Sequence, residues 1–172
     1  MTKLEAGAIK PNAALHDVSE IVGTALGRTS KILARHNVEV EIAADLPMLE
    51  LDAVLFEQVL VNLLDNAAKY APPETLVRIQ GWREEGSVKL QVLDEGSGIP
   101  PEDVERIFDK FHRAQKGDQV RAGTGLGLAI SRGFIEAMHG AITAANRADR
   151  PGAVFTLTLP IPAPTERLDT AA

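Results

Sequence analysis

The strongest constraint on the fold is the run between Asp52 and Tyr70, in which apolar and polar residues recur at helical spacing. Asp52 is suited to cap the start of a helix here, and Pro72 prevents the helix from continuing. The run therefore predicts an amphipathic helix that packs on a core by one flank. The apolar residues of that flank are Leu55, Val59, Leu60, Leu63, Leu64 and Ala67.

The opposite face of this helix carries an unusual set of polar residues. Gln58, Asn62, Asn66 and Lys69 recur at i, i+4, i+8 and i+11, which places them on one side. Asparagine is a poor helix former, because its amide competes for backbone hydrogen bonds. Carboxamide oxygens suit a hard cation, and an ammonium suits phosphate. The face is interpreted as a ligand site; the alternative is the solvated side of an ordinary amphipathic helix.

Composition bounds the remaining possibilities. The chain has 172 residues, of which 45% are hydrophobic, so one packed domain is expected. The absence of cysteine excludes disulfides and thiolate sites, and a net charge of −6 argues against general binding of nucleic acid. The sequence contains no signal peptide and no apolar run of membrane-spanning length. We therefore expect a soluble, cytoplasmic domain, whose larger parent could still be membrane-bound.

The order of predicted elements indicates the fold class. Hairpins combined with long helices favour a mixed, mostly antiparallel sheet with helices on one face, an α+β two-layer sandwich. A linker is expected over 1–12, the domain over 13–160 and a flexible tail over 161–172. The other expected elements are a helix over 17–36, strands over 38–42, 77–81 and 88–92, a short helix over 100–108, a polar loop over 112–124, a helix over 126–139 closed by Gly140, and strands over 141–146 and 153–159.

A second motif, Asp94-x-Gly96-x-Gly98-Ile99, follows the second strand of the predicted hairpin. A carboxylate at this place can accept a hydrogen bond from an exocyclic amine such as N6 of adenine. Two glycines after the acid allow another backbone or a flat ligand to approach closely. The alternative interpretation is a glycine turn with a solvated aspartate.

A third motif and the loop before it suggest contact with phosphate. The segment from Gly123 to Gly127 opens a predicted helix, and free N–H groups at a helix start bind phosphate. The preceding loop is locally basic, which is typical of a lid that brings cations to a triphosphate. A flexible hinge and solvated surface charges are the alternatives. The cations of the loop are Lys110, Arg113, Lys116 and Arg121.

Taken in order, these features resemble the N, G1, F and G2 boxes of the catalytic and ATP-binding domain of two-component sensor histidine kinases, a member of the GHKL superfamily with a Bergerat-type fold. The resemblance covers about residues 50–160. The segments 55–72 and 115–125 resemble KdpD-type potassium-responsive sensors most. In the same superfamily, an anti-sigma serine kinase or a clamp ATPase remains an alternative, and so does a non-catalytic nucleotide-binding module.

The resemblance implies ATP and Mg²⁺ as cofactors and gives each motif a role. Asn66 would hold Mg²⁺, Asn62 and Lys69 would contact phosphate, and Tyr70 would pack beside the nucleotide. Asp94 would accept a hydrogen bond from adenine N6. The other implied site residues are Gly96, Gly98 and Ile99 in the pocket, Gly123, Thr124, Gly125, Leu126 and Gly127 over the triphosphate, Arg113, Lys116 and Arg121 in the lid, and Phe108 and Phe111 as lid anchors.

The resemblance also implies partners. The γ-phosphate would pass to a histidine on a dimerisation domain absent from this chain, and then to a response regulator. The chain would be the cytoplasmic domain of a membrane-bound parent kinase, and without the dimerisation helices it is expected to be monomeric. One departure concerns Gly152-Ala153, where relatives often have Gly-Thr, so a hydroxyl contact near adenine is expected to be missing.

Overall fold

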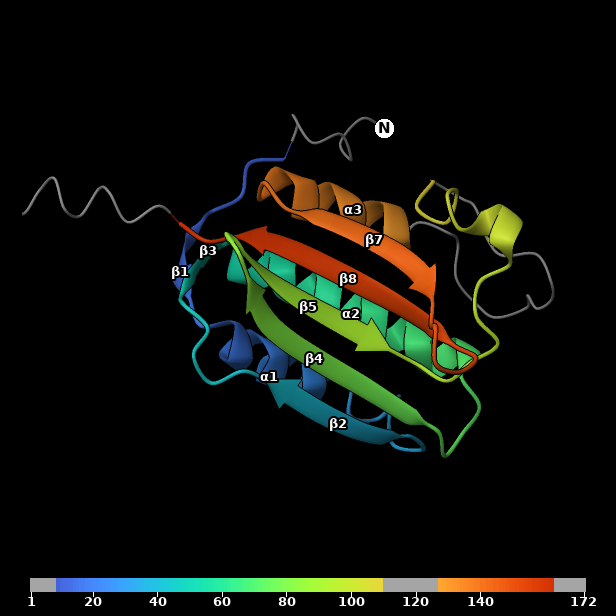
Figure 1. The fold of residues 1–172 in the computed structure, drawn as a ribbon. Helices are drawn as coiled ribbons and strands as arrows, with labels where there is room; N and C mark the ends of the chain where they lie inside the picture. Colours follow the sequence, from blue (N-terminus) through green and yellow to red (C-terminus); the bar gives the residue numbers. More distant parts are fainter. Residues whose placement is uncertain (1–8, 110–126, 163–172) are drawn as a thin grey trace, which may run out of the picture.

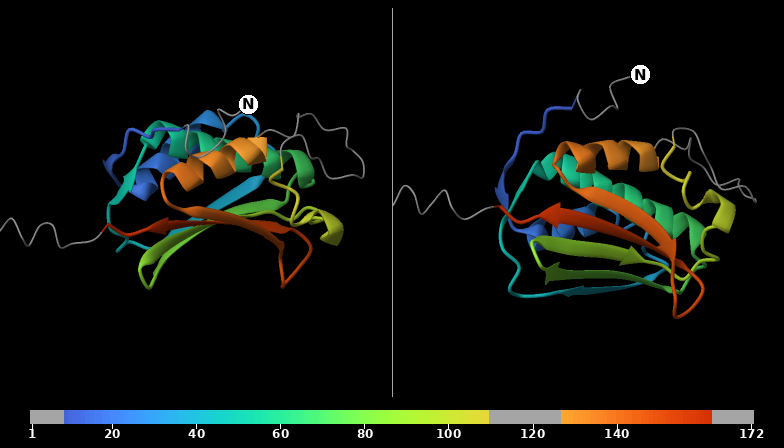
Figure 2. Two further views of the ribbon diagram at one scale, coloured as in Figure 1. Left: turned by 90° about the horizontal axis from the view of Figure 1, so that it is seen from above. Right: turned by 45° about the horizontal axis from the view of Figure 1, so that its top comes forward.

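The computed structural model describes residues 9–109 and 127–162, which form a mixed sheet with a layer of helices on one face (Figure 1). The elements of these two layers are α1 (Val18–Arg28), β2 (Asn37–Ile42), α2 (Ala53–Tyr70), β4 (Leu76–Glu84), β5 (Ser87–Leu93), α3 (Gly127–Ala137), β7 (Ala141–Asn146) and β8 (Ala153–Pro160). The strand order is β2-β4-β5-β8-β7, and every pair is antiparallel except the parallel pair β2 and β4. The predicted α+β two-layer sandwich is confirmed (Figure 2).

Helix α2 lies in the middle of the helical layer, between α1 and α3 (Figure 2). The Asp52 carboxylate accepts hydrogen bonds from the N–H groups of Val54 and Leu55, so the predicted cap is confirmed. The helix ends at Tyr70, before the two prolines, as expected. Its buried residues, which anchor it to the sheet, are Phe56, Val59, Leu60, Leu63, Leu64 and Ala67.

The central strands alternate between a buried face and an exposed polar face. Strands β4 and β5 form the predicted hairpin, which turns through Glu85 and Gly86. On the open face, Arg78 and Glu39 form a salt bridge of 3.0 Å between neighbouring strands. The fully buried side chains of the inner face include Val77, Ile79, Val88, Leu90, Leu157 and Leu159.

A second, two-stranded antiparallel sheet consists of β1 (Ala14–His16) and β3 (Leu49–Leu51). The sequence did not predict it, because strands of three residues are too short to show alternation. It is tied to α2, since the N–H of Asn12 donates to Oδ2 of Asp52, 2.8 Å away. The same aspartate therefore fixes both this small sheet and the start of the central helix.

The first predicted helix was too long. Asp17 caps α1 through the N–H of Ser19, but the helix ends at Arg28 and residues 29–35 form turns. Both the N–H and the hydroxyl of Thr29 donate to the carbonyl of Ala25, and the backbone leaves helical geometry at Thr29, with φ −105° and ψ 11°. Leu33 is still buried from these turns, and this explains why the apolar spacing suggested a helix.

Two other predicted boundaries were also wrong. The segment 100–108 contains only a 3₁₀ helix, Pro101–Asp103, followed by turn residues. Helix α3 ends at Ala137, and the left-handed residue after it is His139, with φ 67°, rather than Gly140. Gly140 instead packs closely on β8, where an added Cβ would lie 2.6 Å from the carbonyl oxygen of Thr158.

Some expectations fall outside the described residues. These are most of the linker over 1–12, the polar loop over 112–124 and most of the tail over 161–172. Within the described part of the chain, none of the helices combines the length and the apolar character needed to cross a membrane.

Candidate functional site

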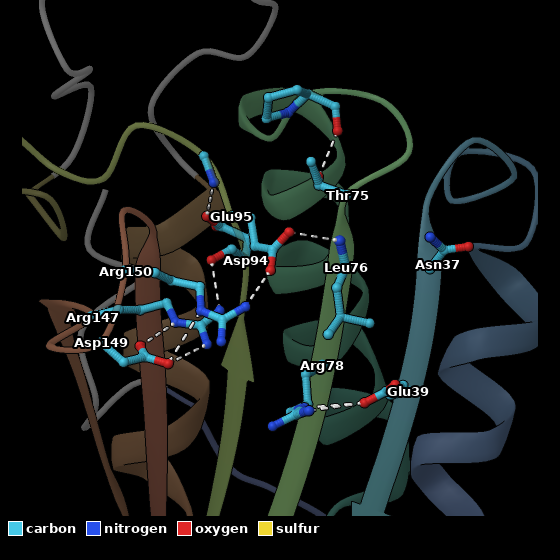
Figure 3. Close-up of polar contacts among 12 residues, drawn as sticks. Asn37, Glu39, Thr75, Leu76, Arg78, Asp94, Glu95, Arg147, Asp149 and Arg150 are labelled. Carbon is cyan, nitrogen blue, oxygen red and sulfur yellow. Dashed lines mark hydrogen bonds and ion pairs between the residues drawn. The ribbon is translucent and has the colours of Figure 1, made fainter.

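Asp94 lies directly after β5 and is only 5% exposed (Figure 3). Its Oδ1 accepts hydrogen bonds from the N–H groups of Gly96, at 2.8 Å, and Ala153, at 3.2 Å. Burial raises the pKa of this carboxyl group, and the two backbone hydrogen bonds and the Arg147 charge partly oppose that rise. No described residue donates to Oδ2, so this oxygen can accept from a ligand.

The glycines after Asp94 permit close contacts between segments distant in the sequence. A Cβ at position 96 would lie 2.7 Å from the carbonyl oxygen of Tyr70, so only glycine fits against the end of α2. Gly98 has φ +89°, in the left-handed region. The N–H of Ile99 donates to Oδ1 of Asn146 at 2.6 Å, and Nδ2 of Asn146 donates to the Ile99 carbonyl at 2.9 Å. The segment 96–99 is thereby held between α2 and the end of β7.

Asn62 connects the two helices that border the site. Its Nδ2 donates to the carbonyl of Gly127, at 3.3 Å, and to Oγ of Ser131, at 3.1 Å. Its Oδ1 accepts from Nε2 of Gln58 at 2.9 Å. The asparagine thus fixes the start of α3, the element that the glycine-rich motif was expected to open. Its expected contact with phosphate stays a prediction.

Asn66 has a different environment one turn later. Its side chain is half-buried and makes no hydrogen bond with the described residues, so its carboxamide oxygen is available to a hard cation. This donor fits Mg²⁺, which is usually held in proteins by few protein oxygens together with phosphate and water. The cation itself stays a prediction.

Lys69 and Tyr70 lie at the C-terminal end of α2. The Lys69 ammonium pairs with the Asp65 carboxylate at 3.1 Å. Both residues line a hollow of about 450 Å³, which is also lined by Arg35 and His36 from the segment after α1. Their expected contacts with a nucleotide are therefore not tested by the described geometry.

Phe108 anchors the segment that precedes the predicted lid. The ring is 8% exposed and meets the ring of Phe155 edge-on, with centroids 6.3 Å apart. The Arg132 guanidinium lies 5.7 Å from its centroid, so α3 and β8 both hold this residue. The other predicted lid and helix-start residues, Lys110, Phe111, Arg113, Lys116, Arg121, Gly123, Thr124, Gly125 and Leu126, lie outside the described residues.

Sequence reasoning missed the residues that support Asp94 from the turn between β7 and β8. Arg147 donates from Nη1 to the Asp94 carbonyl at 3.1 Å, and Arg150 pairs with Glu95 at 2.8 Å (Figure 3). At the position of the expected departure, the backbone N–H of Ala153 donates to the Asp94 carboxylate, and the missing hydroxyl contact near adenine stays a prediction. The only signal for this turn was the glycine before the last strand, Gly152.

The fold and the sequence both match known proteins. A family model described as "Histidine kinase-, DNA gyrase B-, and HSP90-like ATPase" matches residues 51–163. Sensor protein KdpD of Clostridium acetobutylicum is 37% identical over 161 residues, covering 93% of this chain. Sensor protein KdpD of Escherichia coli (strain K12) is 38% identical over 160 residues, also covering 93% of this chain. This chain spans only 18% of the length of each of these relatives.

Two solved structures show the same arrangement of elements. The mycobacterial sensor histidine kinase MprB is 28% identical with a TM-score of 0.76, and the match covers 88% of this chain and 99% of that one. Full-length ShkA in complex with AMPPNP is 26% identical with a TM-score of 0.77, covering 90% of this chain and 33% of that one.

Proposed function

The chain belongs to the histidine kinase-, DNA gyrase B- and HSP90-like ATPase family as an ATP-binding catalytic domain of the sensor histidine kinase type, and we propose that it transfers the γ-phosphate of ATP to a protein histidine. KdpD sensor proteins are among its relatives. The names of the relatives do not favour an anti-sigma kinase, a clamp ATPase or a non-catalytic module. The proposed catalytic unit spans residues 13–160.

The observation that carries this proposal is the environment of Asp94. One carboxylate oxygen is held by two backbone N–H groups, and the other has no donor among the described residues. Oδ2 is not one of the buried side-chain atoms that lack a partner, so it is open to solvent or to a ligand and can accept a hydrogen bond from a donor in the pocket. Adenine offers an amine at N6, where guanine offers an acceptor. Asp94 therefore supports recognition of an adenine nucleotide.

The phosphates would lie along the polar face of α2, where Asn66 is available and where α3 begins. Mg²⁺, when bound, would neutralise charge on the phosphates. In this proposal Asn66 holds the cation, while Asn62 positions the first residue of α3 through the Gly127 carbonyl. Phosphoryl transfer needs positioning and charge neutralisation more than covalent chemistry from the protein, so these residue types are sufficient.

The histidine that receives the phosphate would belong to a dimerisation domain of the parent protein, and a response regulator would take it next. The KdpD relatives are about five times longer than this chain, since it covers 18% of each. We propose that the domain functions on the cytoplasmic side, where ATP is available, and that the isolated chain is monomeric. Light scattering that gave the mass of a stable dimer would contradict the second statement.

Phosphotransfer to a separately supplied dimerisation domain of the KdpD type tests the proposed function. This chain without substitutions, incubated with Mg²⁺ and γ-labelled ATP, is expected to label the receiving histidine. An acceptor domain without that histidine should stay unlabelled. Asn66→Ala is expected to lower the rate by about 10²-fold, by analogy with other electrostatic groups in active sites. Gln91→Ala, on the open face of the sheet, serves as a control. No labelling by the parent chain would refute the proposal.

A further inference from the structure

Arg147 is a buried arginine in an otherwise exposed turn. Its side chain is 5% exposed, while Asp149 and Arg150 in the same turn are exposed. Burying a guanidinium is costly unless its donors are paired, so a buried position in a turn requires specific partners. The partners are the Asp149 carboxylate, bound through Nε at 3.2 Å and Nη2 at 3.3 Å, and the Asp94 carbonyl, bound through Nη1 at 3.1 Å.

The backbone of Asp94 is also held by hydrogen bonds from the turn that contains Arg147. Its N–H donates to the Ala153 carbonyl at 3.0 Å, and Ala153 returns a hydrogen bond to Oδ1. The N–H of Arg147 donates to the Gly152 carbonyl at 2.9 Å and closes the turn. A Cβ on Gly152 would overlap the Asp94 carbonyl oxygen, so the turn reaches Asp94 only because this residue is glycine. The hydrogen bonds that hold the Asp94 backbone and carboxylate therefore come from residues 147–153 and from Gly96.

A second ion pair ties the turn to the neighbouring residue. Arg150 contacts Glu95 at 2.8 Å, and the other oxygen of Glu95 accepts from the N–H of Leu76 at 3.2 Å (Figure 3). Arg150 also reaches Asp149 at 3.2 Å, so the two arginines share one carboxylate. Arg147 donates to the Asp94 carbonyl, whereas Arg150 donates to Glu95 and makes no hydrogen bond to Asp94, so Arg150 is the matched control for the contact with Asp94.

We propose that Arg147 is a positioning residue that sets nucleotide specificity, because it holds Asp94 with Oδ2 directed at the amine of an adenine ring. The inference rests on the proposed function, in which Asp94 recognises adenine. The turn 147–152 would then determine which base the site accepts, although none of its side chains needs to touch the nucleotide.

Arg147 has an electrostatic role beside its geometric one. Burial raises the pKa of Asp94, the adjacent Glu95 charge raises it further, and the Arg147 charge lowers it. A protonated carboxyl group would present a donor where the adenine amine needs an acceptor. Loss of the guanidinium should therefore extend the pH range in which Asp94 is protonated, and binding of ATP should fail at a higher pH than in the parent.

The test compares three variants, Arg147→Met, Arg147→Lys and the control Arg150→Met, by calorimetry with non-hydrolysable ATP and GTP analogues across pH. Arg147→Met is expected to weaken ATP binding about tenfold, because the charge-assisted hydrogen bond that holds Asp94 is lost. Binding of the GTP analogue should change less than twofold. The midpoint of the acid loss of ATP binding should move to higher pH, because the Arg147 charge lowers the pKa of Asp94 in the parent. Arg147→Lys should restore the midpoint but not the full affinity, because lysine keeps the charge and loses the planar fork. Arg150→Met should leave the ATP-to-GTP ratio and the midpoint unchanged.

A readout without nucleotide distinguishes failure of this inference from failure of the proposed function. The Asp94 carboxyl carbon can be titrated by NMR in the apo chain, and its pKa should be higher in Arg147→Met than in the parent. If the parent binds no ATP, the proposed function fails, and the NMR titration still decides whether Arg147 controls Asp94. An unchanged pKa and an unchanged ATP-to-GTP ratio in Arg147→Met would overturn the inference, as would an equal loss in Arg150→Met. If Arg147→Met does not fold, full ATP affinity in Arg147→Lys would overturn it.

Discussion

Replacement of Asp94 by asparagine should invert the hydrogen-bonding character of the pocket without changing its shape. The N–H groups of Gly96 and Ala153 both point at Oδ1, so the amide oxygen of the variant must take that position. The amide nitrogen then replaces Oδ2 and presents a donor to the pocket. Because this donor faces the adenine amine, the complex loses the hydrogen bond from the amine to a charged carboxylate. The amide N–H and the amine are then two buried donors without an acceptor. The expected cost is about 2–4 kcal/mol, or about 30-fold to 10³-fold in affinity.

The same variant should be at least as stable as the parent when no nucleotide is bound. Burial raises the pKa of Asp94 in the folded state, so the folded protein loses stability as the pH rises through that pKa. Asparagine removes this penalty at pH 7. Its melting temperature should therefore equal or exceed that of the parent at pH 7, and the difference should narrow as the pH falls and Asp94 becomes protonated.

Competition with a fluorescent ATP analogue, together with thermal melts at several pH values, measures both effects. Asp45→Asn, in an exposed turn, is the matched control and should change neither quantity. Asp94→Asn should lose ATP binding, while binding of a GTP analogue stays level or improves, because guanine presents an acceptor at this edge. Full retention of ATP binding by Asp94→Asn would refute the assigned role of Asp94. A large loss of stability at pH 7 would refute the burial argument.

Three further substitutions test how the site is held. Gly152→Ala should lower the free energy of unfolding by at least about 2 kcal/mol, because its Cβ would overlap a carbonyl oxygen at the end of β5; an unchanged urea midpoint would contradict this. The hydrogen bond from the Leu76 N–H and the Arg150 guanidinium lower the pKa of Glu95, so its stabilisation is lost as the pH falls through that pKa. Glu95→Gln should therefore melt lower than the parent at pH 7, with a difference that shrinks in acid; a constant difference would argue against the linkage. Phe108→Ala should cost about 3–5 kcal/mol in urea unfolding, as expected for a buried aromatic ring, and a loss below 1 kcal/mol would indicate that the ring is not anchored.

The parts of the fold that the sequence predicted are those with long, regular patterns. Helix α2 was predicted with its cap and its end, because Asp52 and Pro72 bracket a long amphipathic repeat. The β4–β5 hairpin was predicted from alternation on both sides of a turn. The predicted end of α1 was wrong, because the backbone leaves helical geometry at Thr29 while Leu33 continues the apolar spacing. The spacing of apolar residues in the sequence does not distinguish a buried residue in a turn from a buried residue in a helix.

The support of the site could not be predicted for a different reason. The contact of Asn146 with Ile99 joins residues 47 apart in the chain, and that of Arg147 with Asp94 joins residues 53 apart. These partners depend on β7 and β8 pairing beside β5, which a local pattern does not encode. The sequence therefore identified the groups that would face a ligand, but not the turn that directs one of them.

Binding of an adenine nucleotide with Mg²⁺ at the site around Asp94 and Asn66 is measured by titrating the unmodified chain with a non-hydrolysable ATP analogue in a calorimeter. The titration is run with and without Mg²⁺, and with a GTP analogue as the control. We expect saturable binding of one ATP analogue per chain, strengthened by Mg²⁺. Binding of the GTP analogue should be weaker by at least about 10²-fold, because guanine mispairs with the Asp94 carboxylate. Equal binding of the two nucleotides, or no binding of either, would contradict this expectation.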